Sequence, residues 1–486
     1  MEDNSKEFRM FPLGCEEKYF LSNVYSEDKL IAENVRTKII VDKYKAQNSI
    51  CYLYPSNSSE YAKLSNFFEF RIEGKLEDLI GEKIGSISIT KGYNSGAKST
   101  LLAPYWENKV IKVYPDEIFI RHKIKELKNN NEVLFVITEN KLLQPYGGIE
   151  RYFTGDVKVN SKPRVILNSS NGMSYIFDKY FDSIDIKIEN TEGSFTYAYH
   201  VLRVENLETK LSSVEDLSPI IETIDNILLY LSFATRQRTV WIRWATIIDN
   251  ELVDYIRCNI VYPQIDIEDP LIERKSLQNF LQHCLEWIEQ RQSKEIDLYL
   301  PIIYLIGYRN KTAESQFLSL FIALEALLNI FAEYKEISRH LSRAQWRKFS
   351  KELNKEIEKF CFSPDPDQNS KDRELMVKKL SRLNEPSLEL FYNEFCKYYS
   401  IDNSDLWPVF GKDSKISLST IRNKLVHGKR FEYIDYLSIA IEHLQWIVER
   451  CILSVLGWKE SSDVNSDKLN KYYAYHNWRP IYEHNL

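Results

Sequence analysis

The residues best suited to chemistry stand close together in the C-terminal third of the chain, in the run RNKLVHG at 422–428. Arg422 supplies a permanent cation, Asn423 an amide and His427 a titratable imidazole, and no acidic residue separates them. A cation that balances developing negative charge, beside a group that can move a proton, suits a phosphodiester better than a peptide bond. This run is therefore the candidate catalytic motif.

The motif is expected to lie at the end of a helix that covers residues 416–428. Apolar residues recur three and four positions apart on one face, at Leu418, Ile421 and Leu425. Ser417 or Ser419 can cap the start of this helix, and Gly428 suits the left-handed position just beyond its end. The arginine then lies about 140° around the helix and roughly 7.5 Å along it from the histidine. A long guanidinium can still swing to the side of a groove that the imidazole borders.

A second helix, expected over residues 312–334, carries the acidic group that best complements the motif. Its wide apolar face consists of Phe317, Leu320, Phe321, Leu324, Leu327, Leu328 and Phe331. Glu325 lies within this apolar run, and burying a carboxylate without a partner costs free energy. We therefore expect Glu325 to pair with Arg422, and the alternative is that Glu325 faces solvent.

Length and composition limit the kind of protein that this chain can be. A chain of 486 residues should hold two or three domains, and its net charge of −6 means that any nucleic-acid contact must be a local patch. The seven cysteines form no CxxC motif and no zinc-like cluster with histidine, which indicates reduced thiols. The N-terminus lacks a signal pattern, and no run of 18 uncharged apolar residues occurs. We therefore expect a cytoplasmic protein with no membrane span.

The hydrophobic pattern divides the chain into three segments and predicts an α+β fold. Residues 1–205 carry short alternating runs and are expected to form a β-rich domain, a sandwich or a similar fold. Residues 206–310 form a mixed connecting region, and residues 311–486 are expected to form an all-α helical bundle. Within this bundle, two prolines and several acids predict a loop over 363–372, followed by a helix over about 375–399.

A basic and aromatic strand is expected in the middle region. It interleaves Arg236, Arg238 and Arg243 with Trp241 and Trp244. Such interleaving can stack and clamp single-stranded RNA. The alternative, which we favour, is an amphipathic strand with a salt-bridged face.

The spacing within the motif resembles that of a known family. Arg422-Asn423-x-x-x-His427 resembles the R-x4–6-H signature of HEPN domains, commonly RNxxxH. The upstream helix containing ALEALL, and a long helix expected over 432–457, are similar to the antiparallel bundle of that family. The chain most resembles ApeA-type antiphage defence proteins, in which a β-rich region precedes a C-terminal HEPN domain. The resemblance covers about 311–460 by pattern, and the remainder by architecture.

This resemblance implies a metal-independent endoribonuclease that needs no cofactor and acts in antiphage defence through abortive infection. Arg422 would position or neutralise the scissile phosphate, and His427 would act as general acid or base. Asn423 would orient the imidazole or the 2′-hydroxyl, and Glu325 would brace the arginine. Three further cations are expected to contact the RNA: Lys424, Lys429 and Arg430.

RNA chemistry supports the same activity, because RNA carries its own nucleophile in the 2′-hydroxyl. Attack on the adjacent phosphorus needs a base, an acid and a cation, whereas one chain offers a single histidine in the motif. Two chains related by a two-fold axis would offer two of each to one groove. We therefore expect a homodimer or a higher even oligomer, with an interface formed by the apolar faces of residues 416–428 and 432–457. The products would be a 2′,3′-cyclic phosphate and a 5′-hydroxyl.

Three other interpretations remain open from the sequence. Arg422 and His427 can be a structural pair, in which the histidine satisfies helix carbonyls and the arginine binds a local carboxylate. The bundle can be a non-catalytic HEPN-like dimerisation or partner-binding module. The β-rich region can be the main functional part, as a sensor of a carbohydrate or another ligand. If the chain is a nuclease, we expect RNA, for example tRNA, as substrate and a phage-derived trigger that acts through the β-rich region.

Overall fold

The computed structural model describes most of the chain and divides it into two compact units, Met1–Glu289 and Gln290–Leu486. The first unit is β-rich and the second is helical, so the predicted α+β class with this order of parts is confirmed. The residues described are 15–42, 45–77, 83–94, 110–123, 132–143, 149–151, 157–159, 165–188, 191–207, 211–260, 269–290, 296–307, 312–337, 341–360, 362, 364–384, 386–411, 415–428, 434–460 and 462–483.

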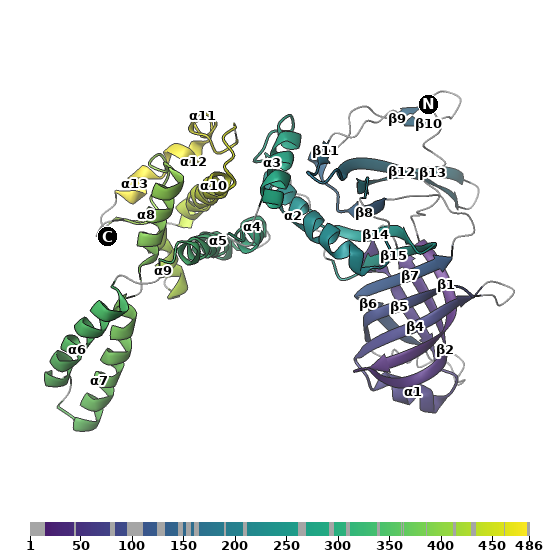
Figure 1. Cartoon of the computed structure of the whole chain (residues 1–486), viewed down its shortest axis with the longest axis horizontal. Helices are drawn as coiled ribbons and strands as arrows, with labels where there is room; N and C mark the ends of the chain where they lie inside the picture. Colours follow the sequence, from purple (N-terminus) through teal and green to yellow (C-terminus); the bar gives the residue numbers. More distant parts are fainter. Residues whose placement is uncertain are drawn as a thin grey trace. The chain divides into compact units, whose positions relative to one another are not determined.

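Six strands of the first unit close into a barrel, in the order β5-β4-β1-β2-β3-β6 (Figure 1). The ring closes because β5 pairs with β6 as well as with β4. The strands are β1 (Cys15–Ser26), β2 (Lys29–Asp42), β3 (Ile50–Tyr54), β4 (Glu69–Glu77), β5 (Lys83–Asn94) and β6 (Ile111–Pro115). A short helix, α1 (Ser58–Ser65), follows β3.

The barrel interior is apolar because its strands alternate between inward and outward side chains. In β2, Val35, Ile39 and Val41 are buried, whereas Arg36 between them is exposed. The inward residues of β1, β3, β4, β5 and β6 complete one continuous core. The outward residues of the same strands are therefore left for solvent or for a partner.

The sheet continues beyond the barrel through a series of further strands, because β5 also pairs with β7. These strands are, in spatial order, β7 (Glu117–Lys123), β15 (Glu251–Arg257), β14 (Trp241–Ile248), β8 (Val133–Ile137), β13 (Thr191–Glu205), β12 (Ser174–Ile188) and β11 (Val165–Asn168). A separate two-stranded sheet joins β9 (Ile149–Arg151) to β10 (Val157–Val159). The first unit therefore contains one 13-stranded sheet that is a barrel at one end, rather than the sandwich that the sequence suggested.

The middle of the chain belongs to this sheet and does not form a connecting region of its own. Strands β14 and β15 lie between β8 and β7, and the unit boundary falls at residue 289 instead of 205. Helix α2 (Ser218–Thr235) packs beside β14, where Asp225 accepts a hydrogen bond from the Trp241 indole at 2.8 Å. Helix α3 (Leu277–Gln290) packs on α2. The difference arises because strand pairing between segments far apart in sequence is not visible in a local pattern.

The basic and aromatic strand of the middle region is internal. Arg243 forms two hydrogen bonds to Asp254 on β15, at 2.6 and 2.7 Å, and both side chains are almost fully buried. Trp241 and Trp244 are buried as well. The predicted ion pairing is present for Arg243, but the predicted amphipathic strand is wrong, because β14 is buried on both faces. The RNA clamp is wrong for Arg243, Trp241 and Trp244, since none of them can reach a ligand. Arg236 is the C-cap of α2, and Arg238 is exposed before the strand begins.

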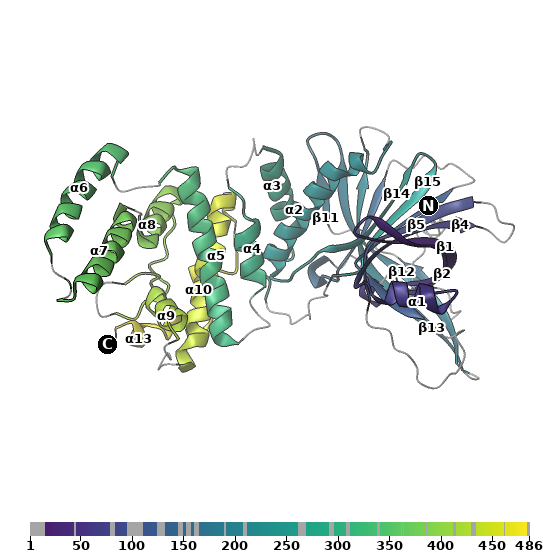
Figure 2. The same ribbon diagram turned by 90° about the horizontal axis from the view of Figure 1, so that it is seen from below.

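The second unit contains helices and no strand among its described residues, and helix α5 runs through its centre. Helix α5 packs against α4, α8, α9 and α10, and the views in Figures 1 and 2 agree on this arrangement. The helices are α4 (Tyr299–Ile306), α5 (Ala313–Tyr334), α6 (Arg343–Lys359), α7 (Pro366–Leu380), α8 (Leu388–Tyr399), α9 (Leu418–Val426), α10 (Leu437–Leu456), α11 (Ser466–Leu469), α12 (Tyr473–His476) and α13 (Arg479–Tyr482).

The loop predicted over 363–372 is wrong, because α7 begins at Pro366 within it. Proline is tolerated at the first position of a helix, where its missing N–H would have no partner in any case. The single helix predicted over about 375–399 is also wrong. It is divided into α7, a 3-10 turn at Ser381–Asn384 and α8, and Pro386 follows the turn.

In the part of the chain that the structure describes, two helices are long and apolar enough to cross a membrane by length and composition, Glu215–Thr235 and Ala313–Tyr334. More than half of each apolar window is buried within the protein. Burial in a core explains the same composition, because a helix that packs on several neighbours is apolar on most of its faces.

Candidate active site

Helix α9 is short and sharply bounded at both ends. The Ser417 hydroxyl accepts a hydrogen bond from the Thr420 amide at 3.3 Å, and Leu418 and Ile421 anchor one face of the helix in the core. Gly428 follows the helix with φ of +66°, a left-handed conformation that glycine adopts without strain. The predicted N-cap at Ser417 and the predicted helix end at Gly428 are therefore confirmed. Together they place His427 at the C-terminal end of α9.

Arg422 of α9 and Glu325 of α5 form the ion pair that the sequence predicted. One guanidinium nitrogen donates to Glu325 Oε1 at 2.9 Å. The exposed fractions of the two side chains are 33% and 26%, so the pair lies at the edge of the core. Glu325 thus neither stands alone inside the bundle nor faces solvent without a partner.

Two further contacts orient the guanidinium. Its other terminal nitrogen donates to the amide oxygen of Asn423 at 3.2 Å. The Phe321 ring lies beneath it, with 5.8 Å between the guanidinium carbon and the ring centroid. An arginine side chain has five N–H donors, so these contacts leave others that can meet the oxygens of a phosphate.

Phe321 was predicted to belong to the apolar face of its helix and not to the site. Phe321 stands four residues before Glu325 on α5, and residues at this spacing share a face of a helix. Once Glu325 is paired with Arg422, the same spacing places an aromatic ring under the guanidinium. That signal was available in the sequence.

His427 occupies the C-cap of α9 and is exposed to solvent. Its backbone N–H donates to the Asn423 carbonyl at 3.2 Å. Within the described part of the chain, its ring makes no hydrogen bond and no ion pair with another residue. The structural interpretation of the pair is therefore met in one half only: Arg422 binds a carboxylate, that of Glu325, whereas the described contacts include none from the His427 ring to the last helix carbonyls.

The three predicted RNA-contacting cations are only partly placed. Lys424 is half-buried on α9, with no ion pair among the described residues. Lys429 and Arg430 lie outside the described residues. The structure thus brings Arg422, Asn423 and Glu325 into direct contact and places His427 one turn further along the same helix.

The expected dimer interface needs a correction. Most of helix α10 is buried within its own unit, so its apolar face is already covered and cannot meet a second chain. The exposed apolar side chains nearest to the ion pair in sequence are Ile322 on α5 and Val426 on α9, which are 41% and 51% exposed.

Comparisons of the chain with protein-family models, with curated proteins and with solved structures found no match.

Proposed function

We propose that this protein is a metal-independent endoribonuclease whose catalytic group is built on helix α9. The observation that carries the proposal is the arrangement of Arg422 and His427. The guanidinium is held by Glu325, Asn423 and the Phe321 ring, whereas the imidazole on the same helix is exposed and has no described partner. A fixed cation beside an available acid–base group is what phosphodiester transesterification requires.

The proposed reaction uses the RNA's own 2′-hydroxyl as nucleophile. A histidine takes the proton from the 2′-oxygen, which attacks phosphorus, and the bond from phosphorus to the 5′-oxygen breaks. A second histidine, which is protonated, gives its proton to the leaving 5′-oxygen, and Arg422 balances the charge that develops on the phosphoryl oxygens. The products are a 2′,3′-cyclic phosphate and a 5′-hydroxyl, so no bound ion is needed for the balance of atoms and charge.

One histidine cannot act as base and acid in the same attack, which is why we propose a composite site between two copies. A symmetric dimer would bring two copies of Arg422 and His427 to one groove. Ile322 stands three residues before Glu325, and Val426 stands four residues after Arg422, so each lies within about one helical turn of the ion pair on its own helix. Their exposed side chains are the apolar contacts that we propose for this interface.

The test is cleavage of purified RNA by the purified full chain in excess EDTA. Wild type, Arg422→Ala and His427→Ala are incubated with total RNA and with tRNA, and the ends of the products are mapped. His476→Ala is the matched control, because His476 is an exposed histidine outside the motif. We expect wild type and the control to leave 2′,3′-cyclic ends, and both motif variants to leave the RNA intact.

Equal cleavage by wild type and His427→Ala would assign any activity to a contaminant and would reject the proposal. A wild type that cuts no RNA, but has the mass of a dimer in light scattering, would support the non-catalytic dimerisation module instead. The antiphage role rests on the family resemblance alone. It is tested by phage plating on cells that carry wild type or His427→Ala.

A further inference from the structure

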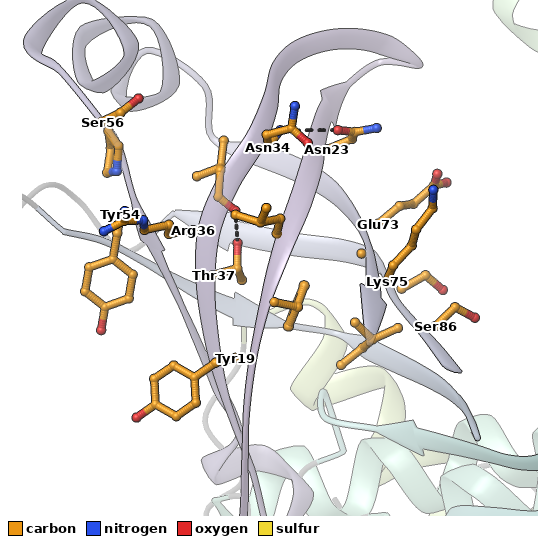
Figure 3. A pocket seen from close by; sticks show the side chains of 17 residues that line it. Tyr19, Asn23, Asn34, Arg36, Thr37, Tyr54, Ser56, Glu73, Lys75 and Ser86 are labelled. Atoms are coloured by element: carbon orange, nitrogen blue, oxygen red, sulfur yellow. Dashed lines mark hydrogen bonds between the residues drawn. The ribbon is translucent and has the colours of Figure 1, made fainter. Parts of the chain in front are cut away.

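The outer face of the barrel carries a depression of about 1350 Å³ that the proposed nuclease chemistry does not use (Figure 3). It extends across β3, β2, β1, β4 and β5, which are neighbours in the sheet. Five strands at about 4.8 Å spacing span roughly 19 Å, which is wider than a single small ligand requires. The shape therefore fits an extended ligand.

Large apolar and aromatic side chains are exposed in this depression. The exposed fractions are 66% for Tyr19, 55% for Leu21 and 36% for Tyr54. The rings of the two tyrosines are accessible to a ligand. Leu21 on β1 stands opposite Arg36 on β2 in the strand register. Exposed rings on a sheet surface are the platforms on which the bases of single-stranded nucleic acids stack.

Two cations border the same rings. In the strand register Arg36 stands opposite Tyr54, and Lys75 stands opposite Leu21, so they flank the apolar side chains from β2 and β4. Figure 3 shows Arg36 with Tyr54 and Tyr19 on one side of the depression and Lys75 on the other. Neither cation has an ion pair in the part of the chain that the structure describes.

The only acidic side chain that lines the depression among the described residues is that of Glu73. Glu73 lies 3.5 Å from the Arg71 guanidinium, which binds Asp28 more closely, at 2.7 Å. Two cations, Arg36 and Lys75, and one carboxylate, Glu73, therefore line the depression, which leaves a net charge of +1 there, whereas the whole chain carries −6.

We propose that this depression binds single-stranded nucleic acid, with Tyr19 and Tyr54 stacking bases and Arg36 and Lys75 contacting phosphates. An acidic peptide could form ion pairs with the two cations, but its carboxylates would not stack on the tyrosine rings. A neutral sugar would use the rings but not the cations. Nucleic acid uses both, because its bases stack on rings while its phosphates meet cations at regular intervals along an extended chain, and it would give the β-rich unit a recognition role of its own.

The test measures binding rather than cleavage, so its failure is distinguishable from failure of the proposed nuclease. The full chain carries His427→Ala to protect the probe, a fluorescein-labelled 12-nucleotide oligouridine, and fluorescence anisotropy gives the Kd. We expect Arg36→Glu combined with Lys75→Glu to weaken binding at least tenfold, and to lower the slope of log affinity against log salt by about one to two. Lys91→Glu combined with Lys275→Glu makes the same charge change outside the depression, and it should change Kd less than twofold.

Tyr19→Ala combined with Tyr54→Ala isolates the stacking contribution and should weaken binding by tenfold or more. Circular dichroism checks that each variant keeps its strand content, since these side chains point away from the barrel core. Absence of oligouridine binding by the parent protein would overturn the proposal. So would displacement of the probe by polyglutamate with no dependence on the two tyrosines, which would indicate an acidic peptide. Equal binding of a deoxyribose probe would support the proposal and place recognition at the bases and phosphates.

Discussion

The two units of this protein each contain an arginine–carboxylate pair between separate elements, and the pairs differ in almost every physical respect. In the sheet, Arg243 binds Asp254 through two short hydrogen bonds, and 2% and 3% of the two side chains are exposed. In the bundle, Arg422 binds Glu325 through one hydrogen bond, and about a third and a quarter of the side chains are exposed.

The difference shows how the same pair of groups can serve structure in one place and chemistry in another. When a guanidinium is buried and makes two hydrogen bonds to one carboxylate, the carboxylate compensates its charge and no ligand can reach it. A guanidinium bound at one position at the edge of a core is oriented, yet it keeps donors for a ligand. The following predictions test this contrast, from the largest expected effect to the smallest.

Breaking the buried pair should have the largest effect. Arg243→Ala leaves Asp254 as an uncompensated charge inside the sheet, so we expect the free energy of unfolding to fall by about 3–5 kcal/mol. Urea denaturation followed by tryptophan fluorescence measures this loss. A loss below 1 kcal/mol would mean that water reaches Asp254, and the contrast between the two pairs would disappear.

Breaking the exposed pair should act on activity instead of stability. Arg422→Ala should lower RNA cleavage by about 10²–10³-fold, because the developing negative charge loses its cation. The same change should cost no more than about 1 kcal/mol of unfolding free energy, because pairs at this exposure contribute little. Cleavage rates and denaturation curves are measured on one preparation. A large loss of stability with Arg422→Ala would assign the pair to structure.

Among the described residues, each unit also buries one histidine, and acid should destabilise both. Burial lowers the pKa of His443 to about 4, and burial likewise lowers the pKa of His200 to about 4. Because the unfolded state takes up the proton near pH 6.5, stability falls as the pH drops from about 6.5 to about 4 and then levels off. Each histidine should cost about 2 kcal/mol at pH 5 relative to pH 7.5.

The two histidines differ in their partners, which allows a finer test. His443 accepts a hydrogen bond from the Trp407 amide at 3.1 Å and lies 2.9 Å from the Ala474 carbonyl. Neither ring nitrogen of His200 has a hydrogen-bond partner among the residues that the structure describes. His443→Gln should flatten the pH dependence of the unfolding free energy of the bundle between pH 5 and 7, and leave that of the sheet unchanged. A pH dependence that persists in the bundle would assign it to other groups.

The smallest predicted effect concerns the carboxylate that positions the arginine. Glu325→Gln keeps a hydrogen-bond acceptor but removes the charge, so we expect cleavage to fall by about tenfold with little change in stability. The loss should appear in kcat more than in KM if Glu325 acts by holding Arg422 in place. Asn329→Asp is a control, since it changes charge at an exposed position one turn further along α5. The two variants change the charge with opposite sign, so a gain in cleavage with Asn329→Asp as large as the loss with Glu325→Gln would point to a general charge effect.

The parts of this structure that the sequence predicted are those that depend on local pattern. Helices α5 and α9, the cap at Ser417 and the stop at Gly428 follow from spacing and residue type. The Glu325–Arg422 pair was predictable as well, because an acidic residue inside an apolar face needs a partner.

The parts that were missed depend on contacts between distant segments or on residues with two possible roles. The closure of the barrel needs β5 to pair with β6, which no periodicity in either strand records. An ion pair was predicted for Arg243, but its partner Asp254 lies on the neighbouring strand β15. The sequence does not reveal that β14 and β15 are internal strands of the sheet. Pro366 could end or begin a helix, and the choice of a loop was wrong.

Strand β5 has one further consequence for the first unit. It pairs with β4 along most of its length, with β7 near its start and with β6 at its end. The ring and the open part of the sheet thus have one strand in common, and unfolding of β5 releases hydrogen bonds of both parts. Residues 1–289 should accordingly melt as a single cooperative species, with amide exchange protection that decays together at both ends of the sheet.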